Sequence, residues 1–309
     1  MIKKKLLTLS LALMLTSCSN YGTKPTTNSP SIMCPTGGPA VALSCMASSK
    51  KFETTSDPSL LMGYFGAENY DVIVAPTDVG IKAIKQGANY QLAATITFGN
   101  FYLVSTGLDN NSTIDEGDSI VLFQKNGLPD KIFHYIYGLD FETSITYVSN
   151  VAVAATSYQN KKVTTESGDK IDADYVLLSE PKLTALQIDE EKVINLNEKF
   201  EEKSGIARIF QASVFTKDSF EGAYAFLENL KNGIENMTQI TQTAVKDYMN
   251  VVSDPQTFFG MTPELAQKCI NKNNSLGIGF MYAKDAIPAI KNYLEIIGVG
   301  EINENYIKQ

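Results

Sequence analysis

Short apolar segments that suit buried strands alternate with helix patterns along most of this sequence. Residues 70–75 (YDVIVA) form a buried-strand pattern, and the helix pattern that follows begins at Pro76 and ends at Gly87. Two further strand patterns come next, at residues 90–97 and 101–105. This spacing of strands and helices is typical of parallel strands with helices on both faces of the sheet, so the sequence predicts an α/β fold.

A polar, turn-rich segment divides this alternation into two series. Residues 107–117 (GLDNNSTIDEG) are mostly Asp, Asn, Ser, Thr and Gly, and we expect a boundary between two lobes near them. The second series contains strand patterns at residues 119–124, 174–178 and 208–216. After Asp218 the chain is predicted to be mostly helical. One predicted helix face there consists of Met237, Ile240, Ala244, Tyr248 and Val251.

The first eighteen residues have the order of an export signal. Lysines at positions 3–5 precede an apolar run at 6–15, which is too short to span a membrane. Residues 15–18 (LTSC) resemble a bacterial lipobox, in which the cysteine is lipidated and becomes the new first residue. We therefore expect a lipoprotein signal peptide at 1–17, a lipid on Cys18 and a flexible tether at 18–30. The alternative is an ordinary signal peptide that is cut near Ser17.

Export would place the protein outside the cytoplasm, anchored by its lipid to the cell membrane. The net charge is −8, and it becomes −11 without the three lysines of the signal. An acidic chain argues against nucleic-acid partners, because phosphates require clustered cations. It also argues against folding onto an anionic membrane surface, so we expect contact with the membrane through the N-terminal lipid alone.

The cysteines predict no disulfide framework. With Cys18 assigned to the lipid, Cys34, Cys45 and Cys269 remain, which is an odd number. A Cys34–Cys45 bridge stays open, since an oxidising compartment permits it. The alternative is three buried thiols that act as small apolar side chains.

Five segments resemble the solute-binding proteins of bacterial ABC importers, and most closely the sulfonate, nitrate and thiamine-precursor group. They occur in the same order along the two sequences and cover much of residues 31–297. They are residues 37–40 (GGPA), 71–78 (DVIVAPTD), 128–130 (LPD), 171–181 (IDADYVLLSEP) and 210–215 (FQASVF).

This resemblance implies a two-lobed periplasmic-binding-protein type II fold. Each lobe would be a mainly parallel sheet flanked by helices, and two crossover strands would join the lobes. Lobe one would contain residues 31–107 and 206–309, and lobe two residues 108–205. The implied function is capture of a small organic solute, a heterocyclic vitamin precursor or a sulfonate-like compound, for an ABC permease. The resemblance implies a monomer with no cofactor, no bound metal and no enzymatic activity.

The candidate ligand-binding residues follow predicted strands, because open α/β sheets bind ligands at the carboxyl ends of their strands. In lobe one they are Gly37, Gly38, Thr77, Asp78, Thr97, Phe98 and Asn100. In lobe two they are Asn126, Gly127, Ser149, Asn150 and Glu180. Each position also has a purely structural interpretation, as a tight turn, a helix N-cap or a β-turn.

The charge of the ligand stays open. Arg208 is the only arginine and we expect it on the surface, which weakens the case for a strongly anionic ligand. Asp78 and Glu180 in the same cleft would favour an amine. Two other classes of function remain, a surface-anchored sensor or adhesin and a secreted enzyme on the same fold. A triad would have to use His134, the only histidine, which the pattern places on a helix away from the strand ends.

Overall fold

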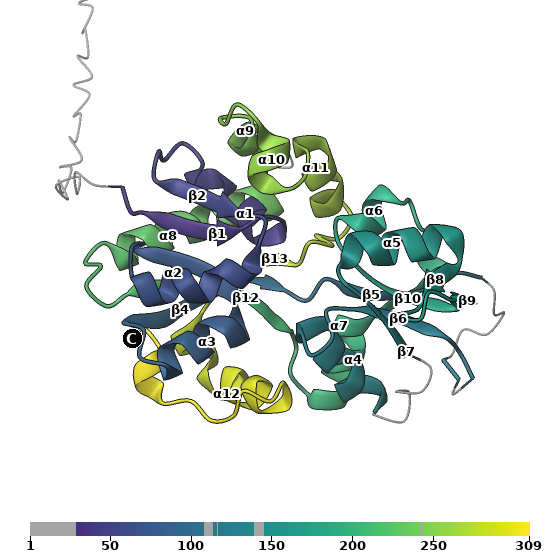
Figure 1. Cartoon of the computed structure of the whole chain (residues 1–309). Helices are drawn as coiled ribbons and strands as arrows, with labels where there is room; N and C mark the ends of the chain where they lie inside the picture. Colours follow the sequence, from purple (N-terminus) through teal and green to yellow (C-terminus); the bar gives the residue numbers. More distant parts are fainter. Residues whose placement is uncertain (1–28, 108–113, 116, 139–144, 242) are drawn as a thin grey trace, which may run out of the picture.

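The computed structural model describes residues 29–107, 114–115, 117–138, 145–241 and 243–309. The predicted signal peptide, Cys18 and most of the predicted tether lie outside the described residues. Two lobes lie side by side, each built on its own sheet (Figure 1). The predicted two-lobed α/β fold is confirmed.

Lobe one contains the six-stranded sheet with the order β13-β4-β12-β3-β1-β2. Its strands are β1 (Ile32–Pro35), β2 (Phe52–Thr55), β3 (Val72–Pro76), β4 (Tyr90–Phe98), β12 (Phe210–Lys217) and β13 (Ile278–Tyr282). The pairs β1–β2 and β1–β3 are parallel, whereas β12 runs antiparallel to both β3 and β4. The carboxyl ends of β1, β3 and β4 therefore lie at the same edge as the start of β12.

Helices cover both faces of this sheet, as predicted. One face packs against α1 (Gly38–Ala42), α8 (Ala223–Glu235), α9 (Ala244–Met249), α10 (Pro255–Phe259) and α11 (Pro263–Asn271). The other packs against α2 (Leu61–Ala67), α3 (Thr77–Lys85) and α12 (Ile287–Ile296). In the part of the chain that is described, no helix is both long and apolar enough to cross a membrane.

Lobe two contains the five-stranded sheet with the order β11-β5-β10-β6-β7. Its strands are β5 (Phe101–Ser105), β6 (Ile120–Phe123), β7 (Ile145–Val148), β10 (Tyr175–Ser179) and β11 (Val193–Asn195). The helices are α4 (Leu128–Tyr137), α5 (Val151–Asn160), α6 (Lys182–Ala185) and α7 (Leu196–Ser204), and a hairpin of β8 (Lys162–Thr164) and β9 (Lys170–Asp172) is attached. Only β5 runs against the other four strands of this sheet.

The chain passes between the lobes earlier than predicted. β4 ends at Phe98 in the first sheet, and β5 begins at Phe101 in the second. The first crossover is therefore Gly99–Asn100 and not the segment near Gly107. Polar composition marks the loop after β5, but the crossover itself sits between two apolar strands and has no polar signal. The return crossover, between α7 and β12, lies close to the predicted position 206.

Helix α8 does not continue as the sequence predicts. It passes into a π-helical turn at Asn236–Ile240, and α9 begins only at Ala244. The π turn and the break after it destroy the 3.6-residue register, so Ile240 is 75% exposed and Val251 is 57% exposed. The predicted apolar face over residues 237–251 is therefore wrong at Ile240 and Val251, whereas Met237 and Ala244 are buried and Tyr248 packs against the core. Strand β13 was not predicted either, because residues 278–282 fall inside the segment expected to be helical.

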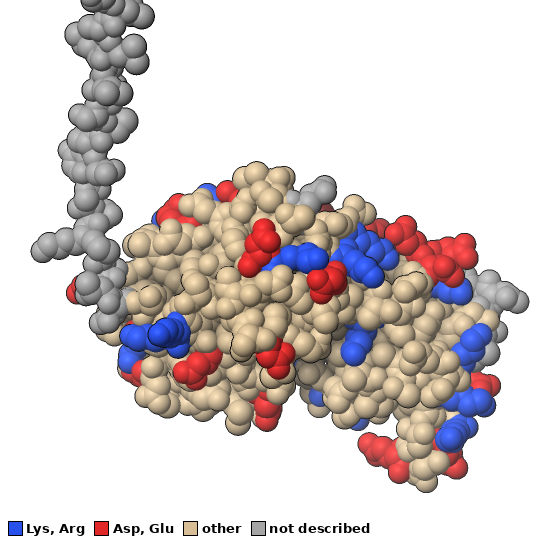
Figure 2. Space-filling view, turned by 90° about the horizontal axis from the view of Figure 1, so that it is seen from above, with Lys and Arg blue, Asp and Glu red and all other residues tan. Residues whose placement is uncertain are grey.

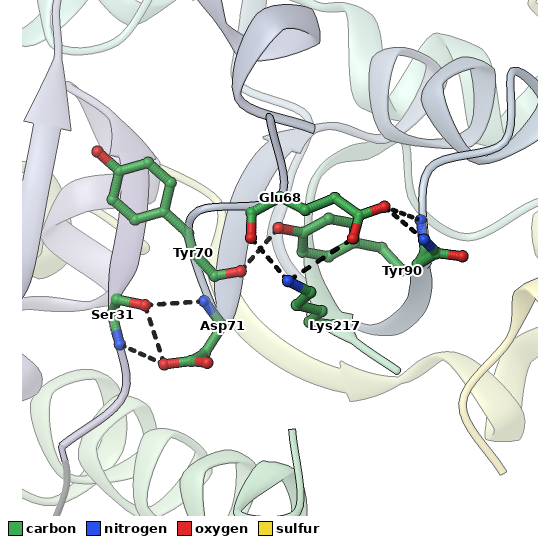
Figure 3. Close-up of polar contacts among 7 residues, drawn as sticks. Ser31, Glu68, Tyr70, Asp71, Tyr90 and Lys217 are labelled. Carbon is green, nitrogen blue, oxygen red and sulfur yellow. Dashed lines mark hydrogen bonds and ion pairs between the residues drawn. The ribbon is translucent and has the colours of Figure 1, made fainter. Parts of the chain in front are cut away.

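Polar side chains hold the edge of lobe one opposite the crossovers (Figure 3). Ser31, just before β1, donates from its backbone and hydroxyl to the carboxylate of Asp71, just before β3. Lys217, at the end of β12, donates to the Glu68 carbonyl oxygen at 2.7 Å. All of these groups satisfy one another, which indicates that this edge has a structural role.

Candidate functional site

The carboxyl ends of strands from both sheets meet at the crossovers, and three polar side chains cluster there. Thr97 is 1% exposed and Asn100 is 5% exposed. The Gln211 side-chain amide, on the second residue of β12, donates to the Asn100 carbonyl oxygen Oδ1 at 3.0 Å. In the structure Thr97 Oγ1 and Gln211 Oε1 are buried and have no hydrogen-bond partner. Such atoms are rare in native interiors, and each requires an explanation.

Gly38 lies beside this cluster, and Gly37 precedes it in the chain. A β-carbon placed on Gly38 would lie 3.7 Å from Thr97 Cγ2 and 4.0 Å from Asn100 Nδ2. Gly37 has a φ of 98°, a backbone region that favours glycine, and its N–H donates to the Phe259 carbonyl oxygen. The structure therefore brings together three sequence-predicted residues, which are Gly38, Thr97 and Asn100.

Glu180 approaches the same cluster from lobe two. Its backbone N–H donates to the Asn100 carbonyl oxygen at 3.4 Å, and its carboxylate accepts two hydrogen bonds from Thr184, from the N–H and the hydroxyl. The Cys269 thiol, on α11 of lobe one, lies 3.8 Å from Glu180 Oε2. Glu180 is 5% exposed, so a carboxylate is buried at the junction between the lobes.

Asp78 forms an ion pair across the two lobes. Its carboxylate lies 3.1 Å from Lys82 in the same helix and 3.9 Å from Lys131, which belongs to α4 of lobe two. Burial, followed by the nearby Lys82 charge, lowers the pKa of Lys131, and the Asp78 carboxylate partly offsets this effect. The pair therefore adds electrostatic attraction between α3 and α4.

Thr77 is directed into lobe one. Its hydroxyl lies 2.7 Å from the Ser213 hydroxyl, which lies 2.9 Å from the Thr95 hydroxyl. This chain of three buried hydroxyl groups links the start of α3 to β12 and β4. Its contacts give Thr77 a role in holding the sheet beneath the cluster.

The four lobe-two candidates at the ends of β6 and β7 lie in local turns and caps. Asn126 has a φ of 63°, and its N–H donates to Asp130 Oδ2. Gly127 is the N-cap of α4, and its N–H donates to the Gln124 carbonyl oxygen. Ser149 and Asn150 are exposed, and Asn150 Oδ1 caps α5 by accepting from Ala152 and Val153. None of these four contacts the Thr97–Asn100–Gln211 cluster through a hydrogen bond that the structure shows.

Solved structures with this arrangement of lobes cover almost the whole chain. An ABC transporter structure from Parabacteroides distasonis matches with a TM-score of 0.70 at 16% identity, over 90% of this chain and 98% of the other. The aliphatic sulphonate binding protein SsuA of Escherichia coli matches with a TM-score of 0.61 at 13% identity, over 91% and 93%. A Candida albicans protein with the generic periplasmic binding protein fold matches with a TM-score of 0.52 at 9% identity, over 90% and 93%.

The chain has the periplasmic-binding-protein fold. No family model and no curated protein sequence matches it. We refer to the region of the two crossovers as the hinge, and the polar cluster lies at the first crossover and beside the start of β12.

Phe98 and Arg208 also lie near the crossovers, and they border a cavity whose lining does not include the three cluster residues. The Arg208 guanidinium lies 5.0 Å above the Phe98 ring, so the two form a cation–π pair. Both line a cavity of about 240 Å³ that also borders Gly99, Asn197, Asn274 and Gly277. A neighbouring cavity of about 400 Å³ continues along the seam and borders Tyr102, Glu198 and Lys272. Arg208 is exposed, as predicted, and it belongs to this groove.

His134 has a structural environment within lobe two. The described residues contain no group of three or more His, Cys, Asp or Glu side chains that could hold a metal ion. His134 Nε2 lies 3.1 Å from the Tyr147 hydroxyl and 3.2 Å from Asp130 Oδ1, and Tyr147 donates to that same carboxylate atom. These contacts join α4 to β7 within lobe two.

Gln211 and Lys131 are the site residues that the sequence reasoning missed. Gln211 was assigned to an apolar return strand, although a polar residue at the start of FQASVF interrupts that pattern. Lys131 lies in the first turn of α4, where a basic residue is unfavourable next to the positive end of the helix dipole. These two irregularities were the available signals.

We expect Lys131→Met to weaken the attraction between the lobes. Because the ion pair is partly exposed, the cost should be at most about 1 kcal/mol, which is up to about fivefold in affinity for any ligand that requires closure. Lys82→Met is the matched control, since Lys82 contacts the same carboxylate from within lobe one. The ligand affinity should change more between low and high salt in the wild type and in Lys82→Met than in Lys131→Met. Equal salt dependence in all three proteins would contradict the role of this pair.

The three described cysteines are free thiols, and burial should make them unreactive. Burial raises the pKa of Cys45 to about 12, whereas for Cys269 burial and the Glu180 charge raise the pKa to about 11. Thiolates are the reactive form, so at pH 8 we expect little alkylation of Cys34, Cys45 and Cys269 in folded protein. A Cys18→Ser variant should take up iodoacetamide at three sites in urea and at almost none in buffer. Detection of a Cys34–Cys45 disulfide by mass spectrometry would contradict the structure.

Proposed function

We propose that this protein is the extracytoplasmic solute-binding component of an ABC importer and captures a small organic solute between its two lobes. The observation that carries the proposal is the cluster of Thr97, Asn100 and Gln211, which lies at the hinge and presents buried polar atoms without partners. The fold supports it, since relatives by structure include an ABC transporter protein and a sulphonate binding protein.

Closure of the lobes supplies the coupling between binding and delivery. A ligand shifts an open–closed equilibrium only by the difference between its affinities for the two states. Contacts across the seam already join the lobes, including the hydrogen bond from the Tyr102 hydroxyl to the Ser275 carbonyl oxygen at 3.0 Å. A solute that touches both Gln211 and Glu180 would add to these contacts in the closed state. A membrane permease would then recognise the closed form.

The lipid anchor belongs to this proposal as well. The basic start, the apolar run and the LTSC motif support a signal peptide at 1–17 and a lipid on Cys18. The charge distribution agrees with a body that does not bind polyanions. On the face shown in Figure 2, basic and acidic side chains are scattered among each other without a basic patch. Labelling of cells with a palmitate analogue should mark the wild-type protein, and Cys18→Ser should abolish the label.

The binding function itself is tested by a thermal-shift screen of the purified protein. Candidates are pyrimidines, thiamine, riboflavin, alkanesulfonates, taurine, nitrate and amines. A ligand that binds only the folded state stabilises it by about 2.7 kcal/mol at a hundredfold excess over Kd, which is an increase of several degrees in Tm. A saturable increase with one class, confirmed by calorimetry, supports a solute-binding role. If no class binds and none closes the lobes, the same fold would serve as a sensor or scaffold instead.

A further inference from the structure

We propose that the solute is uncharged and presents an amide-like edge, an N–H donor next to a carbonyl acceptor. This inference rests on the proposed solute-binding function and names the chemical class of its ligand. It depends on which polar atoms at the hinge are already paired and which are not.

The amide pair of Asn100 and Gln211 leaves one side-chain oxygen, Gln211 Oε1, and one side-chain nitrogen, Asn100 Nδ2, outside their mutual hydrogen bond. Gln211 Nε2 donates to Asn100 Oδ1, which uses the donor of one side chain and the acceptor of the other. Gln211 Oε1 stays buried without a partner and can accept a hydrogen bond. Asn100 Nδ2 can donate, and it would lie 4.0 Å from a β-carbon placed on Gly38. A ligand that complements both atoms must itself carry a donor and an acceptor close together, as amides, lactams and ureas do.

Thr97 adds a third neutral group beside this pair. Its methyl group and the Asn100 amide nitrogen would both lie within 4.0 Å of a β-carbon placed on Gly38, and its hydroxyl is buried without a partner. A hydroxyl both donates and accepts, so it can satisfy either atom of an amide edge. Buried polar atoms without partners cost free energy. A bound solute that forms hydrogen bonds with them would remove this cost and so bind more tightly.

The charged groups around the cluster disfavour an ionic ligand. The Glu180 carboxylate accepts two hydrogen bonds from Thr184, and its buried negative charge would repel a sulfonate or a carboxylate. Asp78 is paired with Lys82 and Lys131, so it does not offer a free carboxylate for an amine. Arg208 lies over Phe98 in the groove whose lining does not include the amide pair. The polar atoms of the cluster that lack partners, on Thr97, Asn100 and Gln211, are neutral.

The test uses the full chain and three classes of probe. Uracil, nicotinamide and δ-valerolactam represent uncharged amide edges, butanesulfonate and taurine carry a sulfonate, and putrescine is an amine. We expect a saturable increase in Tm with at least one amide probe and none with the others. If a sulfonate or amine binds and the amides do not, this inference is overturned while the solute-binding function stands. If no probe of any class binds, both are rejected.

Variants then locate the contact. Gln211→Leu should lower the affinity for the amide probe by about tenfold or more. Thr97→Val should lower the same affinity by several-fold. Gln256→Leu, on the exposed face of α10, is the matched control and should leave affinity unchanged. Because the Thr97 hydroxyl has no partner within the protein, Thr97→Val should keep or raise the Tm of the ligand-free protein. A lower Tm together with unchanged affinity would show a purely structural hydroxyl and overturn the assignment.

Discussion

Gly277→Ala should strongly destabilise the folded protein. A β-carbon on Gly277 would lie 1.9 Å from the carbonyl oxygen of Phe98, which is backbone at the first crossover and cannot rotate away. Gly277 also has a φ of 66°, a region in which alanine is strained. Overpacking and backbone strain together should cost about 3 kcal/mol. Urea unfolding, with the free energy of unfolding obtained from the midpoint and slope, measures this loss.

Gly298→Ala separates the two contributions. Gly298 has a φ of 72°, close to that of Gly277, but a β-carbon there would meet nothing within 4 Å. It follows α12 and should therefore report the backbone strain alone, about 1 kcal/mol. If both variants lose the same stability, the close approach of Gly277 to the hinge carries no energetic weight and our description of the hinge is wrong.

Phe210→Ala should be the most destabilising substitution among the aromatic residues near the hinge. Phe210 begins β12 and is 2% exposed. Its ring packs edge-on against Phe98 at 6.1 Å and Tyr293 at 5.4 Å, and Tyr293 in turn packs against Phe200 of lobe two at 6.1 Å. The aromatic cluster therefore continues from one lobe into the other.

Truncation of this ring should cost about 3–5 kcal/mol, because it removes buried apolar area and leaves a cavity that the neighbours cannot fill. Phe210→Leu, which keeps most of the volume, should cost less than about 1.5 kcal/mol. Denaturant unfolding of the two variants beside wild type provides the comparison. Equal losses in both variants would indicate that the cavity does not determine the cost.

The regular strands of the fold were predictable because their signals are local. Strand β3 is a continuous apolar run, since it is buried on both faces, and Pro76 and Thr77 mark the start of the next helix. The crossover at Gly99–Asn100 was not predictable in this way. Both β4 and β5 are apolar, and only their hydrogen bonds to different partner strands assign them to different sheets.

The residues of the candidate site likewise fall into those with a local sequence signal and those without one. Gly38, Thr97 and Asn100 were found because they follow predicted strands, and the structure brings them together. Gln211 could not be placed from its own segment, because its role depends on β12 returning beside the end of β4. One partner each of Asp78 and Glu180, Lys131 and Cys269, likewise comes from the other lobe. Long-range packing decides these contacts, and local patterns do not record it.

The measurement that tests the central claim most directly is the distance between the lobes with and without a bound solute. Small-angle X-ray scattering can follow this distance for the ligand that emerges from the screen. If the lobes close around a solute at the hinge, saturation with that ligand should lower the radius of gyration, and Gln211→Leu should shift the transition to higher ligand concentration. A ligand that binds with an unchanged radius of gyration, or equally well to the Gln211→Leu variant, would contradict capture between the lobes.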